Sequence, residues 1–527
     1  MTSPPVSTYV GVGGVAVTPH HLASRVAVDV MSGGGNAVDA IVAANAVLGM
    51  VLPSTCGIGG DLFAIVHLPG TDRPEVLNAS GRGGTGLDPV RLRAAGHSIM
   101  PLREPDSITV PGCVDGWEAL LARHGTKPLA ELLEPAIALG QGGFEVSVEL
   151  ASDLTRIETL IAGQESARAL YPDGAPPEPG AALHRPDLAA TLAGIARDGR
   201  DAFYRGLVAR AIVAATSGVL DEADLAENSP DWVDPVGVEV FGLHGWTVPP
   251  NSQGYLTLAA AVLIEAIDPP RDPDDPAFHH AVIEAYRAVA WERDDLVADP
   301  RFTPMDPGRL LDRERILARL PSIDPEMAAT WPEPAEAPGG TAYFCAVDRE
   351  GMAVSAIQSN FTGIGSGISA GATGVFLHNR GGGFSLVPGH PNEAAPGKRP
   401  SHTLSPTLWT RGDRAAMVLG TRGGHQQPQY LAQMVALLLH ADLDPASAQA
   451  LPRWHAEGPG PTASSITVEA RMPEAVVEGL EHRGHMVEMG PDHPQGWGPV
   501  SVITIDPDGG RVAAADPRVT SALAAGQ

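Results

Sequence analysis

The junction between residues 321–340 and the run that follows constrains this chain more than any other feature of its sequence. Residues 321–340 hold five prolines and are rich in Glu and Ala, so they cannot continue a helix or a central strand. This composition predicts an exposed, extended linker. Thr341 then opens a strand-like run over residues 341–348, and residues 351–358 are the expected hairpin partner across a short turn.

A threonine that directly follows such a linker can act as a nucleophile if the chain is cut in front of it. A Thr hydroxyl needs a base, and the α-amine of an N-terminal Thr, with a pKa of about 8, can serve as that base. Gly340 suits self-cleavage, because it tolerates a strained peptide and leaves the approach to its carbonyl open. The plainer interpretation is that Thr341 only begins a strand after a loop.

Composition limits the remaining classes of function. The 527 residues carry 35 Lys and Arg against 62 Asp and Glu, a net charge of −27, which disfavours nucleic acid and anionic membrane surfaces as partners. A hydrophobic content of 43% is ample for a large core, and three cysteines are too few for a disulfide framework. We see no apolar run of membrane-spanning length and no secretory signal, which predicts a cytoplasmic protein.

Eight short sequence blocks occur in a characteristic order along most of the chain. They are residues 13–24, 34–40, 53–63 with the Gly57-Ile58-Gly59-Gly60 core, 110–116, 133–137, 202–206, 249–254 and 299–302. Together with Gly340-Thr341, these blocks resemble the γ-glutamyltransferase family of N-terminal-nucleophile hydrolases. One block alone would be weak evidence, but eight in order are specific.

The resemblance implies a fold and a cleavage pattern. The expected fold is α+β, a four-layer αββα sandwich in which helices cover two central antiparallel sheets. The expected cleavage site is Gly340-Thr341, which would give a large subunit of residues 1–340 and a small subunit of residues 341–527. The two subunits would form a heterodimer and together make one structural domain; further association stays open.

The resemblance also assigns catalytic roles. Thr341 is the implied nucleophile, and Ser359 takes the place of a second family threonine that orients it. Gly423 and Gly424 match a loop whose backbone N–H groups form an oxyanion hole, where the absence of a Cβ allows close approach.

The substrate pocket departs from the family pattern. Arg82 matches an arginine that binds the substrate carboxylate, and Asn360 lies beside the position of a family asparagine. His402 and Thr403 replace paired serines that hold the same carboxylate, and residues 378–384 lack the acidic residue that binds the glutamyl α-amino group. We therefore expect retained selection for an acid and weakened selection for an α-amine.

These observations predict an autoprocessing amidohydrolase or acyltransferase that acts on a small acidic amide through an acyl-enzyme, without a metal or organic cofactor. The alternatives are an oxamate-type amidohydrolase, a C–C bond hydrolase of secondary metabolism, and a non-catalytic binding protein on the same scaffold. His280 and Glu284 have the spacing of a metal-ligand pair, but no third ligand is evident, and an exposed helix face is the expected explanation.

Overall fold

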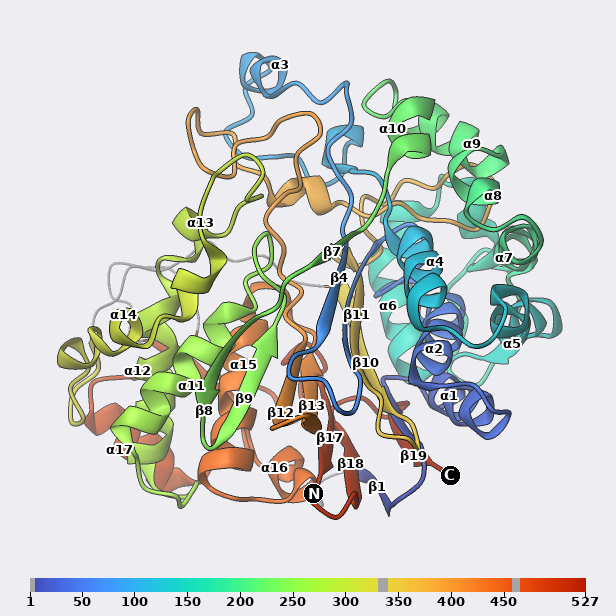
Figure 1. The fold of residues 1–527 in the computed structure, drawn as a ribbon. Helices are drawn as coiled ribbons and strands as arrows, with labels where there is room; N and C mark the ends of the chain where they lie inside the picture. Colours follow the sequence, from blue (N-terminus) through green and yellow to red (C-terminus); the bar gives the residue numbers. More distant parts are fainter. Residues whose placement is uncertain (1–4, 330–339, 457–464) are drawn as a thin grey trace.

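Two seven-stranded antiparallel sheets lie at the centre of the computed structural model, which describes residues 5–329, 340–456 and 465–527 (Figure 1). The first sheet has the strand order β1 (Ser7–Gly11), β18 (Arg511–Ala515), β17 (Val500–Ile505), β13 (Arg414–Thr421), β12 (Thr407–Arg411), β9 (Leu243–Thr247), β8 (Val236–Val240). The second has the order β19 (Leu523–Gly526), β2 (Val15–Thr18), β10 (Gly340–Val347), β11 (Ala353–Phe361), β3 (Asp61–His67), β4 (Glu75–Ala79), β7 (Asp231–Val233).

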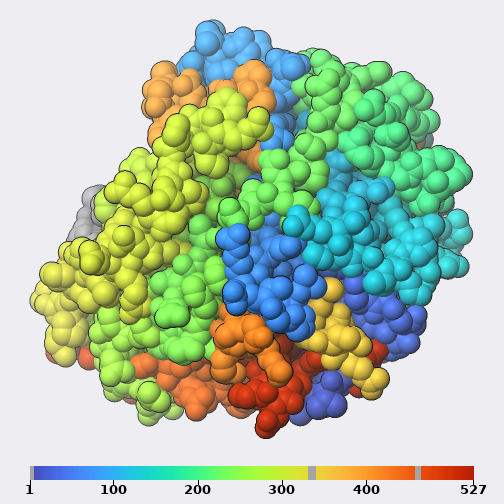
Figure 2. All heavy atoms as spheres, in the orientation of Figure 1, coloured from blue at the N-terminus to red at the C-terminus, as the bar shows by residue number. Residues whose placement is uncertain are grey.

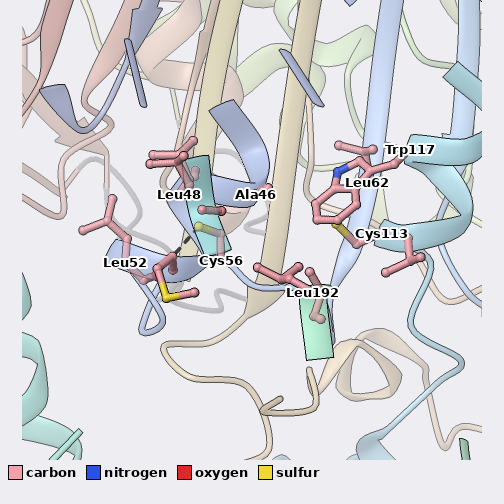
Figure 3. Close-up of a cluster of buried hydrophobic side chains, with 14 of the residues drawn as sticks. Ala46, Leu48, Leu52, Cys56, Leu62, Cys113, Trp117 and Leu192 are labelled. Carbon is pink, nitrogen blue, oxygen red and sulfur yellow. Dashed lines mark hydrogen bonds between the residues drawn. The ribbon is translucent and has the colours of Figure 1, made fainter. Parts of the chain in front are cut away.

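One layer of helices covers the outer face of the second sheet, at the right of Figure 1. It comprises α1 (His21–Ser32), α2 (Ala37–Val51), α4 (Cys113–His124), α5 (Leu129–Gly142), α6 (Val148–Ile161), α7 (Pro186–Asp198), α8 (Arg200–Tyr204), α9 (Leu207–Ala215) and α10 (Glu222–Glu227). The Ala-rich α2 is buried along its whole length, as its sequence predicted. Figure 3 shows part of this core, where Trp117 of α4 packs beside Leu62 of β3.

A second helical layer covers the outer face of the first sheet, at the left of Figure 1. It comprises α11 (Tyr255–Ile267), α12 (Pro276–Ala290), α14 (Arg313–Leu317), α15 (Gln427–Val435), α16 (Pro445–Ala450) and α17 (Glu474–His482). The helices α3 (Pro89–Ala94) and α13 (Arg293–Leu296), the pair β5 (Phe144–Glu145) and β6 (Ala182–Leu183), and a small sheet of β14 (Trp454–Ala456), β15 (Ser465–Val468) and β16 (Met486–Met489) complete the fold. The predicted αββα sandwich is confirmed.

The inner faces of the two sheets pack directly on each other. Along β10, Tyr343, Cys345 and Val347 belong to the inter-sheet core, whereas the alternate residues, such as Phe344, face the helices. Because side chains alternate along a strand, Thr341 shares the inter-sheet face with Tyr343. The nucleophile candidate therefore lies at the end of the inter-sheet layer.

The segments before and after Thr341 contribute to both sheets. In the second sheet, β10 and β11 lie between β2 and β3, and in the first sheet β12 lies between β9 and β13. In the space-filling view, N-terminal and C-terminal segments share one continuous surface (Figure 2). The predicted hairpin is confirmed, with β10 paired to β11 across a turn at Asp348–Gly351.

The predicted linker is described only in part, because residues 330–339 lie outside the described residues. A short 3₁₀ turn covers Leu320–Ser322, and residues 324–328 after it are exposed or partly exposed. Among the described residues, no helix has the length and hydropathy needed to cross a bilayer.

Candidate active site

Three side chains form a row across the inter-sheet face at the ends of three neighbouring strands. Thr341 of β10 pairs with Ser359 of β11, and Ser359 pairs in turn with Asp61 of β3. All three are at most 1% exposed. Strand register alone therefore places two hydroxyls and a carboxylate side by side.

The hydrogen bonds of Ser359 determine which way the hydroxyl protons of Ser359 and Thr341 point. Its Oγ donates to the carbonyl oxygen of Gly340 at 2.7 Å, accepts the N–H of Phe361 at 2.8 Å, and lies 3.0 Å from Thr341 Oγ1. A serine hydroxyl has one proton, and here the Gly340 carbonyl receives it. Thr341 must therefore donate its own proton to Ser359, which leaves a Thr341 lone pair beside the Gly340–Thr341 bond.

The Gly340–Thr341 bond lies at an irregularity in the strand. Gly340 pairs with Phe361, so Asn360 is an extra residue on β11 and the register shifts between Gly340 and Thr341. A Cβ at Gly340 would lie 2.5 Å from the backbone nitrogen of Gly363. Only glycine fits here, which agrees with the expectation that residue 340 leaves its carbonyl open to attack.

Gly423 and Gly424 follow β13 in the opposite sheet. Their φ angles of +134° and +60° are in the region that favours glycine. β13 packs against β10 two residues from Thr341, because a Cβ on its Gly420 would meet the ring of Tyr343 at 2.1 Å. Neither N–H donates a hydrogen bond within the described parts of the chain, whereas Gly424 O accepts one from Gln253 Nε2 at 3.2 Å. Two backbone donors without a partner in those parts suit an oxyanion.

Asp61 organises two histidines from distant segments. Its carboxylate accepts the N–H of Gly81 at 2.9 Å and His402 Nε2–H at 3.0 Å, and it lies 3.4 Å from His378 Nδ1. Burial tends to raise the pKa of Asp61, but the two histidines outweigh it and hold the pKa below its ordinary value. Burial, aided by the charge of Arg380, lowers the pKa of His402 to about 3, so a neutral imidazole faces an ionised carboxylate.

A cavity of about 330 Å³ opens beside this row. Phe361, His402 and Thr403 belong to its wall, together with Gly382, Gly383, Leu102, Phe384 and Gln253. Gln253 Nε2 donates to the carbonyls of both Thr403 and Gly424, at 3.2 Å each, so the cavity wall and the glycine loop are joined through one amide. A larger, open hollow of about 570 Å³, lined by His244 and Arg313, lies towards the far end of the first sheet.

The remaining substrate-binding candidates lie outside this wall. Arg82 donates to Asp231 Oδ2 at 2.8 Å and to Ser229 O at 3.2 Å, and Arg399 shares the same Asp231 carboxylate. Asn360 donates to Pro53 O at 3.2 Å, on the side of the 57–60 glycine loop. The structure thus brings together Thr341, Ser359, His402 and Thr403; the roles of all the candidate site residues, Arg82 and Asn360 included, stay predictions.

Sequence reasoning did not single out Asp61, Gln253 or Arg380. Asp61 stands at the end of the 53–63 block, but nothing local indicates its histidine partners 317 and 341 residues away. Arg380 carried a signal, because it is a cation within the glycine-rich stretch 378–384 where an acid was sought. It is 1% exposed, and its guanidinium donates to Thr403 Oγ1 at 3.2 Å.

The expectation that His280 and Glu284 lie on an exposed helix face without a third partner is wrong. Both are buried, at 1% and 0% exposure, because α12 lies between α11 and α17. His485 joins them, and the candidate ligand atoms of the three residues lie within 4.8 Å of one another. His280 Nδ1 is 2.8 Å from His485 Nε2, while its Nε2 is 2.8 Å from Asp324 O. Glu284 accepts the N–H of Ala329 at 3.1 Å, so the cluster holds the described first part of the linker against α12.

Comparison with known proteins agrees with this architecture. Residues 23–526 match the gamma-glutamyltranspeptidase family. The glutathione hydrolase-like YwrD proenzyme of Bacillus subtilis is 35% identical, covering 97% of this chain and 98% of its own length, and the oxamate amidohydrolase proenzyme of Klebsiella pneumoniae is 34% identical, covering 98% and 99%. The cephalosporin acylase structure from Bacillus halodurans superposes with a TM-score of 0.91 at 31% identity, covering 98% and 96%.

The match spans the Gly340–Thr341 junction and includes most strands of both sheets of the sandwich. The sequence similarity, the fold and the row at the strand ends lead to one assignment: this chain is an enzyme of the gamma-glutamyltranspeptidase family, a group of N-terminal-nucleophile hydrolases.

Proposed function

We propose that this chain is a self-cleaving amidohydrolase in which Thr341 is both the nucleophile of cleavage and the nucleophile of turnover. The observation that carries the proposal is the contact of Thr341 Oγ1 with Ser359 Oγ at 3.0 Å, beside a Gly340 carbonyl that already accepts a hydrogen bond from Ser359. The names of its Bacillus and Klebsiella relatives, both proenzymes, support cleavage of this chain.

Self-cleavage proceeds by an acyl shift from nitrogen to oxygen. Thr341 Oγ1 attacks the Gly340 carbonyl carbon and passes its proton to Ser359, while the proton of Ser359 stabilises the developing oxyanion. The C–N bond then breaks, the proton moves to the leaving nitrogen, and an ester joins Gly340 to Thr341 Oγ1. Water hydrolyses this ester, which leaves a Gly340 carboxylate, a free Thr341 hydroxyl and a new α-amine.

Turnover repeats this chemistry on a substrate amide. The Thr341 α-amine takes the hydroxyl proton, and the N–H groups of Gly423 and Gly424 stabilise the oxyanion. The amine product leaves, and water attacks the acyl-enzyme to release the acid. The large and small subunits stay together as a heterodimer, because each sheet contains strands from both.

The favoured substrate is a small acidic amide, and the favoured outcome is hydrolysis rather than transfer. The remodelled pocket supports this choice, since His402 and Thr403 stand in place of the paired serines. A second candidate, an amidohydrolase acting on oxamate, is favoured by the 34% identity to the Klebsiella oxamate amidohydrolase proenzyme over 98% of this chain.

Two measurements test the proposal. On a denaturing gel, the purified protein of 54.6 kDa should resolve into fragments of about 35 and 19 kDa, apportioned by length, with Thr341 as the new N-terminus. A single full-length band that persists on incubation would overturn it. The mature protein is then assayed with γ-glutamyl anilide, oxamate and simple acyl amides, and rapid transfer from the γ-glutamyl donor would contradict the remodelled pocket.

A further inference from the structure

Arg380 is a buried cation at the back of the cavity wall. It is 1% exposed, and its guanidinium lies 3.8 Å from the centre of the Phe361 ring and donates to Thr403 Oγ1 at 3.2 Å. Burial lowers the pKa of Arg380 to about 9, so it remains charged at neutral pH. Both residues it touches belong to the cavity wall.

The hydrogen bonds of Arg380 are incomplete within the described residues. Its Nη1 is buried there without a hydrogen-bond partner. The Asp61 carboxylate, which favours the charge on Arg380, is itself bonded to His402 and Gly81. Arginine donors inside proteins are almost always bonded, and an unpaired charge out of water is costly. Nη1 is therefore the donor that remains for an incoming anion.

Arg82 is placed differently. Its guanidinium is held by Asp231 and by the Ser229 carbonyl, and neither of these partners lines the cavity, whereas Phe361 and Thr403, which contact Arg380, both do. Asp231 also pairs with Arg399, so two cations share one carboxylate there. A substrate carboxylate would have to compete with Asp231 for Arg82, whereas no ion pair occupies Arg380 within the described residues.

The wall offers little to an ammonium group. Among the described residues that line it, the one carboxylate is Asp294, which pairs with Arg293 at 2.9 Å. A carboxylate that enters beside Phe361 would meet the Arg380 fork and the Thr403 hydroxyl, whereas an α-ammonium group at the same place would meet a like charge.

We infer that Arg380, together with Thr403, binds the substrate carboxylate and selects acyl groups that end in a carboxylate and lack an α-ammonium group. This inference rests on the proposed function, because it concerns the acyl group that Thr341 receives. Gly340 is the register partner of Phe361 in the uncut chain, so cleavage frees the strand end nearest to this subsite.

The test compares three anilides that differ only at the far end of a five-carbon acyl chain. Glutaryl p-nitroanilide ends in a carboxylate, pentanoyl p-nitroanilide ends in a methyl group, and γ-glutamyl p-nitroanilide adds an α-ammonium group to the glutaryl chain. We expect the mature wild-type enzyme to have the highest kcat/KM for the glutaryl substrate. Equal values for the glutaryl and pentanoyl substrates would overturn the inference.

Variants then show which of the two arginines, Arg380 or Arg82, is responsible for the preference for the glutaryl substrate. Arg380→Gln should lower kcat/KM for the glutaryl substrate by about 30-fold or more and leave the pentanoyl substrate within about threefold. The matched variant Arg82→Gln should keep the glutaryl preference. A uniform loss on all three substrates in Arg380→Gln, or loss of the preference in Arg82→Gln instead, would refute the role of Arg380.

Maturation is followed on a gel for each variant. If Arg380→Gln does not mature, Arg380→Lys takes its place: it retains the charge without the fork, and the glutaryl preference should shrink. An undiminished preference in Arg380→Lys would then count against the inference. Failure of the proposed function looks different, because the wild-type protein itself would stay uncut and hydrolyse none of the three anilides.

Discussion

The hydroxyl pair consists of Thr341 and Ser359, and on β11 Ser359 lies only two residues from Phe361, where the cavity wall begins. The two regions nevertheless differ in how many of their hydrogen-bonding groups have a partner. Ser359 donates one hydrogen bond and accepts two, so its capacity is used completely. Beside the wall, Arg380 Nη1 and the N–H groups of Gly423 and Gly424 make no hydrogen bond within the described residues.

This difference indicates two tasks for one end of the sandwich. On the proposed function, the hydrogen bonds of Ser359 are complete in the uncut chain because the group that reacts there, the Gly340 carbonyl, is part of the same chain. On the same proposal, the donors beside the wall are unused in the free protein because their partner is another molecule. On the proposed function, this end of the sandwich serves self-cleavage first and substrate binding afterwards, and the following predictions separate the two tasks.

Thr341→Ala should have the largest effect. Without the hydroxyl neither acyl shift nor turnover is possible, so the protein should remain one species of 54.6 kDa and lose at least about 10⁴-fold in amidase activity. Thr341→Ser keeps the hydroxyl and should still mature. A gel with N-terminal sequencing checks both, and a Thr341→Ala protein that still splits between residues 340 and 341 would remove Thr341 from the nucleophile role.

Asp61→Asn should lower the stability of the folded protein by more than the loss of one ordinary hydrogen bond would. The carboxylate is 1% exposed, and its replacement by an amide removes the negative charge near Arg380 and weakens the acceptor of His402 Nε2–H, so we expect the free energy of unfolding to fall by about 3 kcal/mol. Urea unfolding of both proteins in the uncut Thr341→Ala background measures this.

Asp231→Asn is the matched control, because Asp231 also contacts two basic side chains, Arg82 and Arg399, but its own side chain is 39% exposed. Water screens that pair, so its loss should cost about 1 kcal/mol or less. If the two variants lost the same free energy of unfolding, burial would not explain a difference in stability between Asp61 in the row and Asp231 beside Arg82 and Arg399.

Ser359→Ala should slow self-cleavage by about 100-fold without preventing it, because the Gly340 carbonyl loses one positioned donor. Ser359→Thr retains the hydroxyl and should cleave within a few-fold of the natural rate. The band intensities of freshly purified uncut protein over time give the rates. Ser355→Ala, on the same face of β11 but bonded to Tyr343, is the control and should cleave normally.

The hydroxyl pair could be predicted because it depends on short-range structure. The turn at Asp348–Gly351 sets the hairpin register, and the same register carries along the strands to pair Thr341 with Ser359. The fold followed from sequence blocks that resemble a known family, and the buried α2 followed from its continuous apolar composition; the cleavage site implied by the same blocks stays a prediction.

The cavity wall could not be predicted in the same way. Its polar contacts join residues that are far apart in the chain, such as Asp61 with His402 and Gln253 with Gly424, and no periodicity or spacing encodes them. The position of Arg82 beside Asp231 and the burial of His280 with His485 are likewise tertiary effects. A sequence reading finds the types of residue in these places but not their partners.

The smallest expected effect is on the pH dependence of the free energy of unfolding. It involves His402 of the cavity wall and not the hydroxyl pair. The folded chain holds the pKa of His402 at about 3, against about 6.5 in an unfolded chain. Between these values the unfolded chain binds a proton that the folded chain does not, so acid favours unfolding; the contribution of this residue is complete above pH 6.5 and is lost as the pH falls towards 3. From pH 6.5 to 5 one such histidine costs about 2 kcal/mol.

His402→Gln in the uncut Thr341→Ala background should remove that share of the acid sensitivity. His279→Gln, at a buried histidine with a pKa of about 4 on α12, should remove a similar share independently, because the two sites lie on different elements and share no hydrogen bond. Urea unfolding at pH 6.5 and at pH 5 measures both. If His402→Gln leaves the difference between the two pH values unchanged, the imidazole bonded to Asp61 is already protonated at pH 5, and the wall then holds one more positive charge than its geometry indicates.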